Sequence, residues 1–272
     1  MRFDLVTLFP GFFESTLRYG ILERALRSGL ASVHTHDLRD WTHDRHRTVD
    51  DRPFGGGEGM VLKPQPIFEC VDSLGVSPKS SRDTARESVI LLSAQGKRFT
   101  QSTARRLATL SRVVLVCGRY EGVDERVGQL LCDDELSIGD FVLSGGELGA
   151  AVIIDATVRL LPGVLGHEDS SLYESFGLGD EAAADLTPNG VPRSTHGSGG
   201  LLDYPHYTRP AEFHGVSVPE VLSGGDHSAI RRWRREAALA KTFANRPDLL
   251  GNANLSDDDR EFLAELGAEP RS

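Results

Sequence analysis

The stretch from Cys117 to Glu147 limits the fold of this chain more than any other. It contains two apolar runs that each end in a glycine turn followed by polar residues, in the strings CGRYEG and SIGDFVLSGGE. Glycine at such positions allows a positive φ and lets backbone N–H and C=O groups contact a ligand directly. Open α/β sheets bind their ligands at the carboxyl ends of the strands. The sequence therefore predicts a ligand site here, made largely of backbone groups.

Apolar runs that alternate with helical segments predict an α/β fold around a mainly parallel sheet. Strands are expected at Phe3–Leu8, Ser88–Ser93 and Arg112–Cys117. One helix is expected to start near Thr100. A second, over Leu148–Leu161, is apolar on most of its circumference and is expected to be buried. The polar segment Ser77–Glu87 is expected to be a surface loop.

The character of the chain changes after Leu161. Residues 177–200 hold six Gly and two Pro without periodicity, which indicates a linker or an insertion. Further on, Asp226 is expected to cap one helix, and Ser256 with Asp259 a last, shorter one. The predicted domains are a core over 1–165, an interdomain linker over 166–203, and a small, mainly helical C-terminal domain over 204–272.

The net charge of −10 is unfavourable for binding nucleic acid, so the distribution of charge matters more than its sum. Acidic residues concentrate between 169 and 200 and in the tail from Gly251. Basic residues cluster at Arg45–Arg52 and Arg231–Lys241. Local positive faces are therefore compatible with the acidic average.

The cysteine pattern bears on the compartment. The three cysteines, Cys70, Cys117 and Cys132, lack C-x-x-C spacing. This argues against a disulfide framework and a thiolate zinc site, and is typical of a reducing cytoplasm. No run of about 18 apolar residues is present, which excludes a membrane-spanning helix. The N-terminal segment is typical of a first strand rather than a signal peptide.

The segment Trp41–Gly59 interleaves histidines and aspartates with three arginines and ends in GGGEG. His43 and His46 are of a type that binds metals, but the adjacent cations argue against a metal site. Guanidinium groups suit phosphates. We interpret the segment as a loop that contacts a polyanion, with a solvated polar loop as the alternative.

Three other features stay open on the residues alone. The arginines of Arg231–Arg235 form either an ordinary solvated helix face or a contact surface. Trp233 among them is either a core residue or a stacking platform. Arg159 lies near the end of an otherwise apolar helix. Since a buried arginine is costly unless it is paired, Arg159 is either turned to the surface or functional.

Taken together, these blocks resemble the bacterial tRNA (guanine-N1)-methyltransferase family, TrmD, which modifies the guanine 3′ to the anticodon. The matching strings are LFPGFF, DLRDWTHDRHRTVDDRPFGGGEGMVLK, VCGRYEGVDERV, SIGDFVLSGGEL, RLLPGVLGHE, GLLDYPHYTRP, VPEVLSGGDHSAIRRWRREAAL and RPDLL. The resemblance implies a SPOUT-type parallel sheet with a deep C-terminal trefoil knot. It also implies a homodimer whose active sites use both subunits, and methyl transfer from S-adenosylmethionine to N1 of the guanine at tRNA position 37.

The resemblance carries site residues with it. Donor binding is assigned by position to Gly118, Ile138, Gly139, Asp140, Phe141, Val142, Leu143, Gly145 and Gly146. Contact with the tRNA anticodon stem-loop is assigned to the arginines Arg231–Arg235 and to the earlier loop. In that loop the predicted substrate-binding residues are His43, Arg45, His46, Arg47, Asp50, Arg52, Gly55, Gly56 and Gly57. Mg²⁺ dependence is reported for the family, but the sequence offers no set of ligands for it.

The chemistry needs a base and a cation, because N1 of guanine carries a hydrogen at neutral pH and its loss leaves negative charge on O6. In the family these roles fall to a linker aspartate and an arginine late in the core domain, which matches Arg159. The family's Asp-Ser-Phe reads Glu174-Ser175-Phe176 here, and residues 177–199 stand as an insertion after it. Glu174 is the expected base, with Asp169 and Asp180 as alternatives.

Two rival readings accompany this one. The chain could be a non-catalytic RNA-binding relative whose altered linker has lost methyl transfer, although a pure binder has no need of the donor-binding segment. It could also be a SPOUT methyltransferase with another RNA target, although the nearly complete blocks at Trp41–Gly59 and Pro205–Pro210 count against that. Donor binding tests the first rival, and mapping of the methylated nucleotide tests the second.

Overall fold

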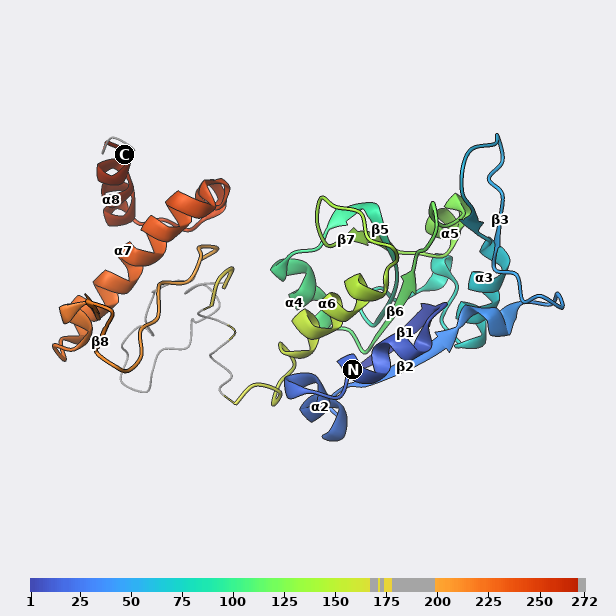
Figure 1. Ribbon diagram of the computed structural model, residues 1–272, viewed down its shortest axis with the longest axis horizontal. Helices are drawn as coiled ribbons and strands as arrows, with labels where there is room; N and C mark the ends of the chain where they lie inside the picture. The colour runs from blue at the N-terminus through green and yellow to red at the C-terminus, as the bar shows by residue number, and fades with distance from the viewer. Residues whose placement is uncertain (167–170, 172–173, 178–198, 269–272) are drawn as a thin grey trace. The chain divides into compact units, whose positions relative to one another are not determined.

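The structure, a computed structural model, describes residues 1–166, 171, 174–177 and 199–268. Its contacts divide the chain into two compact units, Met1–Gly166 and His167–Ser272, called unit 1 and unit 2 below (Figure 1). Among the described residues, no helix combines the length and the apolar character needed to cross a bilayer.

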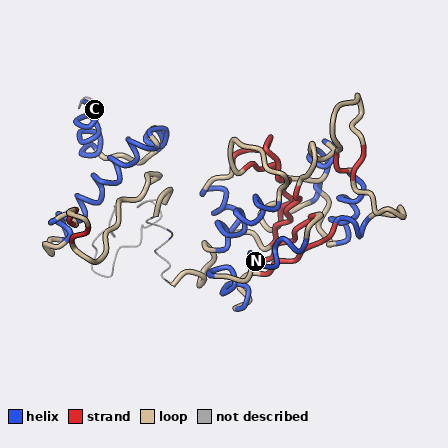
Figure 2. Tube along the Cα trace, viewed as in Figure 1, coloured by secondary structure: helices blue, strands red, loops and turns tan. Residues whose placement is uncertain are grey.

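Unit 1 is built on a five-stranded sheet, whose strands are red in Figure 2. Each strand pairs in parallel with its neighbours, in the order β2-β1-β6-β5-β7. The strands are β1 (Arg2–Thr7), β2 (Ser32–Asp37), β5 (Glu87–Arg98), β6 (Arg112–Cys117) and β7 (Asp134–Ser137). The predicted α/β fold with a parallel central sheet is confirmed. Of the predicted strands, β5 runs further than expected, and its pairing with β7 shifts between Leu92 and Lys97.

Helices cover both faces of this sheet. One face packs against α1 (Phe13–Thr16), α2 (Gly20–Arg27), α4 (Gln101–Ala108) and α6 (Glu147–Val158), and the other against α3 (Pro64–Ser73) and α5 (Glu125–Leu130) (Figure 1). Alternate residues of β6 enter the two cores: Leu115 and Cys117 lie in the first, Val114 and Val116 in the second. Burial on both faces explains why this strand is a continuous apolar run.

The smaller elements of unit 1 are the 3-10 helices η1 (Pro10–Phe12), η2 (Leu38–Trp41) and η3 (Lys79–Ser81), and the antiparallel pair β3 (Asp50–Asp51) and β4 (Val61–Leu62). The expected surface loop Ser77–Glu87 is confirmed, since most of its residues are exposed, and η3 forms one turn within it; Arg82 is the buried exception. The side chain of Arg82 is 1% exposed, and its Nη1 donates hydrogen bonds to Asp133 Oδ2 (2.7 Å) and to the Leu131 carbonyl (2.8 Å). The loop is thus held to the body of unit 1 by the buried side chain of Arg82.

Helix α6 also differs from its prediction. It ends at Val158 rather than Leu161, and it is buried on one side only, with Leu148 50% and Val152 47% exposed. Its apolar circumference therefore leaves two large side chains uncovered within this chain.

Unit 2 contains α7 (His227–Asn245), α8 (Asp257–Ala268), the 3-10 helices η5 (Glu220–Leu222) and η6 (Pro247–Asn252), and the short antiparallel pair β8 (Glu212–Phe213) and β9 (Val216–Ser217). Both predicted helix starts are confirmed. The Asp226 carboxylate accepts hydrogen bonds from the first backbone N–H groups of α7. Ser256 and Asp259 exchange side-chain-to-backbone hydrogen bonds of 2.9 and 3.1 Å. The Asp259 carboxylate also pairs with Arg235, which ties α8 to α7.

Candidate active site

A cavity of about 250 Å³ lies where β5, β6 and β7 end. Its wall is formed by residues 91–95 of β5, residues 118–123 after β6, residues 135–138 at the end of β7, and residues 141–146 before α6. This is the carboxyl edge of the parallel sheet, where ligands of such sheets bind.

Most of the predicted donor-binding residues line this cavity, namely Gly118, Ile138, Phe141, Val142, Leu143, Gly145 and Gly146. Gly139 and Asp140 are not part of the wall. The Asp140 carboxylate is 84% exposed and pairs with Arg98 at 2.6 Å. Sequence reasoning did not single out the other polar residues of the wall, among them Ser93, Gln95, Arg119 and Glu121.

Two glycines allow the loops of the wall to meet backbone to backbone. A Cβ on Gly146 would lie 2.8 Å from the Cα of Cys117, and a Cβ on Gly118 would lie 2.9 Å from the carbonyl oxygen of Leu92. Side chains do not tolerate such distances, so only glycine fits. The N–H of Gly146 donates to the carbonyl of Gly118 at 2.9 Å. The arrangement leaves a cradle bounded by main-chain groups.

A buried carboxylate holds this cradle in place. Glu147 is 2% exposed; its Oε1 accepts a hydrogen bond from Thr7 Oγ1 (2.8 Å), and its Oε2 lies 3.2 Å from Arg119 Nε. The Arg119 guanidinium in turn lies 4.3 Å from the ring centre of Phe9. Charged residues inside the glycine strings CGRYEG and SGGE were the signal that could have identified this cluster.

The cavity wall holds more acidic than basic residues. Glu121, Glu125 and Glu135 belong to it, against Arg119, which pairs with Glu147. Cys117, the last residue of β6 before this wall, is a buried free thiol. Burial, together with the nearby Glu147 carboxylate, raises the pKa of the Cys117 thiol well above its usual range. The thiol therefore stays protonated and is unsuited to act as a nucleophile.

Arg159 lies at the other end of α6 from the cavity. It is half-buried and caps the C-terminus of α6, donating its backbone N–H to the Asp155 carbonyl. Gly149, in the first turn of the same helix, lines the cavity. Ten residues of α-helix span about 15 Å, so unit 1 does not bring Arg159 to its own cavity.

Glu174 lies in unit 2, in a short turn over residues 174–177. Its carbonyl accepts a hydrogen bond from the N–H of Gly177 (2.9 Å), and its own side chain is half-buried. Two hydrogen bonds tie this turn to the segment at residues 201–203. The N–H of Phe176 donates to the Leu201 carbonyl (2.9 Å), and the N–H of Asp203 donates to Ser175 Oγ (3.0 Å). The alternative bases Asp169 and Asp180 lie outside the described residues.

Comparison with known proteins identifies the family. A family model described as tRNA (Guanine-1)-methyltransferase TrmD matches residues 1–252. The chain belongs to this TrmD family. A relative from Koribacter versatilis is 58% identical over 98% of this chain and 99% of its own length, and one from Geobacter metallireducens is 49% identical over 98% of each. Both are named tRNA (guanine-N(1)-)-methyltransferase.

The loops predicted to bind substrate in this TrmD family member are largely open to solvent. His43, Arg45, His46, Arg47, Arg52, Gly55, Gly56 and Gly57 are exposed, and Asp50 is half-buried in β3. Two of them have acidic partners: His43 Nε2 lies 2.7 Å from Glu69, and the Arg47 guanidinium pairs with Asp40. Within the part of the chain that the structure describes, no three His, Cys, Asp or Glu side chains are grouped to hold a metal ion.

The arginines of α7 divide into two kinds. Arg231 and Arg232 are exposed, whereas Arg234 lies over the ring of Tyr204 at 4.9 Å and Arg235 pairs with Asp259. Trp233 is half-buried, with its ring 6.2 Å from that of Tyr207. This TrmD unit 2 thus combines ordinary ion pairs with a cluster of aromatic rings and guanidinium groups.

Proposed function

We propose that this chain transfers a methyl group from S-adenosylmethionine to N1 of the guanine at position 37 of tRNA, 3′ of the anticodon. Its family, and the names of relatives that it covers almost completely, support a tRNA guanine-N1 methyltransferase. The observation in the structure that carries the proposal is the glycine-bounded cavity at the carboxyl edge of the sheet.

The residues of the cavity fit the donor. S-adenosylmethionine carries a sulfonium and an amino group, both positive, and three glutamates stand in the wall. Because Gly118 and Gly146 pack backbone against backbone, this part of the cavity wall presents main-chain groups rather than side chains to a ligand. When bound, the donor supplies a methyl group already activated by the charge on sulfur. The protein must then align the acceptor and manage a proton.

Proton removal is assigned to Glu174. N1 of guanine is a poor nucleophile until its hydrogen leaves, and a positioned carboxylate contributes roughly 10²–10⁴ in rate. The turn at 174–177 is fixed by backbone hydrogen bonds to residues 201–203, which supports a defined position for this side chain. Asp169 and Asp180 remain the alternative bases.

Stabilisation of the negative charge on O6 of the guanine is assigned to Arg159, acting in the active site of a second subunit. A fixed guanidinium stabilises the negative charge that grows as N1 loses its proton. Because Arg159 is about 15 Å along α6 from its own cavity, a homodimer with shared sites is the arrangement that uses it. The exposed Leu148 and Val152 on α6 supply an apolar surface for such a dimer.

A SPOUT-type trefoil knot is part of the proposal. Two observations support it: β7 pairs with β5 rather than with β6, which precedes it in the chain, and the segment after β7 returns to the end of β6 to pack Gly146 against Cys117. Such a return brings loops from distant parts of the chain together around one cavity, as a knotted donor site needs.

The tRNA surface is assigned to the loop after η2 and to α7. Arg45 and Arg52 are exposed, which suits contacts with phosphates, and Phe54 is fully exposed in the glycine-rich part of the loop, which suits stacking on an unpaired base. The target guanine must leave its stack to reach the donor, at a cost of a few kcal/mol.

The test is to incubate the full-length protein with labelled S-adenosylmethionine and an unmodified leucine tRNA transcript, and to digest the product to nucleosides. The proposal expects the label in 1-methylguanosine. Label in another nucleoside would support the reading with a different RNA target. Donor binding without any transfer, with binding measured by calorimetry, would support the non-catalytic reading.

A further inference from the structure

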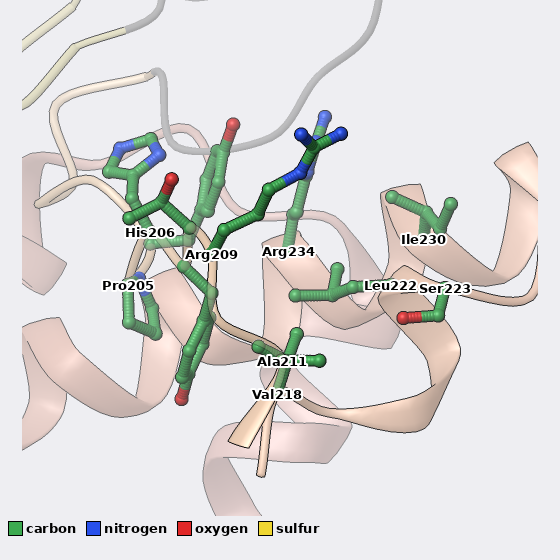
Figure 3. A pocket seen from close by; sticks show the side chains of 12 residues that line it. Pro205, His206, Arg209, Ala211, Val218, Leu222, Ser223, Ile230 and Arg234 are labelled. Atoms are coloured by element: carbon green, nitrogen blue, oxygen red, sulfur yellow. The ribbon is translucent and has the colours of Figure 1, made fainter. Parts of the chain in front are cut away.

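Unit 2 contains a cavity of its own, of about 370 Å³ (Figure 3). Arg234 of α7 lines it, but no assignment above gives the cavity a ligand. Its wall combines residues 204–209 of the segment after the linker turn, the region around η5, and one side of α7. The volume lies within the range of small-ligand pockets, which begins at about 300 Å³. The cavity can therefore take a group of the size of a nucleobase.

The cavity has an apolar end and a cationic end. Ala211, Val218 and Leu222 line the first (Figure 3). At the other end, the side chains of Arg209 and Arg234 extend toward the same edge (Figure 3). Among the described residues that form this wall, none is Asp or Glu. Two guanidinium groups without a carboxylate between them favour an anion.

Flat rings form a third part of the wall. The rings of Tyr204 and His206 are 4.5 Å apart between centres, and the Arg234 guanidinium lies 4.9 Å from the Tyr204 ring centre. Tyr207 also lines the cavity and is 47% exposed. Aromatic and guanidinium planes are the surfaces on which unpaired bases stack.

A hydrogen-bond donor also remains for a ligand. The Nε–H of Arg234 is buried and finds no acceptor among the described residues. A base edge or a phosphate oxygen would satisfy this donor.

The cavity adjoins the turn that carries Glu174. The hydrogen bond from Asp203 N–H to Ser175 Oγ joins this turn to the residue directly before the cavity wall. A nucleotide held here would lie close in the RNA chain to the base on which Glu174 acts. The methylated guanine itself must reach the donor cavity, whose wall belongs to unit 1.

We propose that this cavity binds a second unstacked nucleotide of the tRNA, distinct from the methylated guanine. Its base stacks on the aromatic wall above the apolar end, and its phosphate contacts Arg209 and Arg234. The inference rests on the proposed function, because it takes the tRNA as the ligand.

The test uses the full-length protein and leucine tRNA transcripts that each carry one abasic nucleotide in the anticodon loop, outside the methylated position. RNA binding without donor is measured beside the KM and kcat of methyl transfer. For the unaltered protein, one abasic position is expected to weaken binding about 5- to 100-fold, the effect of losing one stacked base. Tyr207→Leu and Arg234→Lys are expected to raise KM for the intact transcript by a similar factor, with kcat retained, and to abolish the sensitivity to that position.

Matched controls are Tyr207→Phe, which keeps the ring, and Arg260→Gln, which removes one positive charge from α8 outside the cavity. Both are expected to behave like the unaltered protein. Should Arg234→Lys fail to fold, Arg209→Gln at an exposed position replaces it. Thermal melting and donor binding in unit 1 monitor folding.

Three results would overturn the inference. If the cavity variants leave the KM for tRNA unchanged, the cavity takes no part in RNA recognition, and the proposed function still stands. Variants that weaken intact and abasic transcripts equally would reduce the cavity to a phosphate contact. An unaltered protein that binds no tRNA and transfers no methyl group would remove the proposed function together with the inference.

Discussion

Glu147 is a buried carboxylate whose partners come from two distant parts of unit 1. It joins Thr7, at the end of β1, to Arg119, in the loop that follows β6. Glu147→Ala leaves both partners without their acceptor. We expect it to lower the free energy of unfolding by about 2–3 kcal/mol, in the range for hydrogen bonds to charged groups. We also expect weaker binding of S-adenosylmethionine, because the loops of the cradle lose their brace; calorimetry measures this.

Glu23→Gln provides the control for this change. Glu23 forms a pair with Arg27 on the exposed face of α2, at 3.9 Å. Exposed pairs of this kind contribute about 0.3–0.5 kcal/mol, so this variant should retain both stability and donor binding. Equal behaviour of the two variants would mean that Glu147 does not brace the cavity.

The buried environment of the Asp4 carboxylate predicts how the free energy of unfolding depends on pH. Asp4 is fully buried in β1; burial alone would raise its pKa, but hydrogen bonds from His36, Arg2 and Arg112 outweigh this and hold the pKa of Asp4 well below its usual range. When the pKa of a carboxyl group is lower in the folded than in the unfolded state, the group stabilises the fold at pH values above the unfolded-state pKa. This stabilisation is lost as the pH falls through the folded-state pKa. Asp4→Asn should therefore cost about 3–5 kcal/mol at neutral pH, the cost of removing one partner of a buried pair.

The measurement is urea unfolding of the natural chain and Asp4→Asn over a series of pH values. The difference in unfolding free energy should be largest at neutral pH and shrink below about pH 4, where the unfolded aspartate becomes protonated. Asp72→Asn, at an exposed position of α3, should show almost no difference at any pH. A difference for Asp4→Asn that stays constant down to pH 2 would contradict this account.

Some functional residues could be predicted from the sequence and others could not. Gly118 and Gly146 could be predicted, because two backbone segments that pack closely require glycine, and glycine is visible in the sequence. The burial of Arg82 could not be predicted, because a polar segment gives no sign that one of its arginines pairs with an aspartate 51 positions later in the chain. Asp140 was assigned through the resemblance, yet it lies outside the cavity wall and pairs with Arg98.

Helix α6 leads from the donor cavity to Arg159 and carries an uncovered apolar surface. Leu148 and Val152 are one turn apart on it and about half exposed. If this surface is the dimer interface, Val152→Arg places an unpaired charge in it. We expect sedimentation to show a monomer, and methyl transfer to fall about tenfold or more, because an uncompensated buried charge costs several kcal/mol.

Leu130→Arg is the matched control, since Leu130 is 62% exposed on α5, on the opposite face of the sheet. It should leave the oligomeric state and transfer unchanged. A Val152→Arg protein that stays dimeric and fully active would show that this part of α6 is not the interface.

The elements that could be predicted are those buried on two faces. β6 is a pure apolar run because helices cover both of its sides. By contrast, β2 (SVHTHD) has no fully buried residue and β7 (DELS) is only four residues long, so neither has a distinct apolar pattern. The order of the strands and any threading of the chain depend on long-range contacts that apolar periodicity does not record.

A dimer with shared sites makes a prediction about mixed subunits. Arg159→Ala removes the cation from one subunit, and Leu143→Arg places a positive charge in the donor cavity of the other. Each variant alone should be inactive. Hybrid dimers, isolated through two different tags, should regain about half of the natural activity, because one of the two sites then combines an intact cavity with an intact arginine. Hybrids without activity would mean that each subunit uses its own Arg159.

The most direct test of the central claim compares methyl transfer to two leucine tRNA transcripts that differ only at position 37, guanine in one and adenine in the other. The same assay includes Glu174→Gln and Arg159→Ala. The account predicts transfer to the guanine transcript alone, and a fall of roughly 10²-fold or more in the rate for Glu174→Gln. Transfer that survives Glu174→Gln would move the base to Asp169 or Asp180. Transfer to both transcripts, or to neither, would contradict the proposed function.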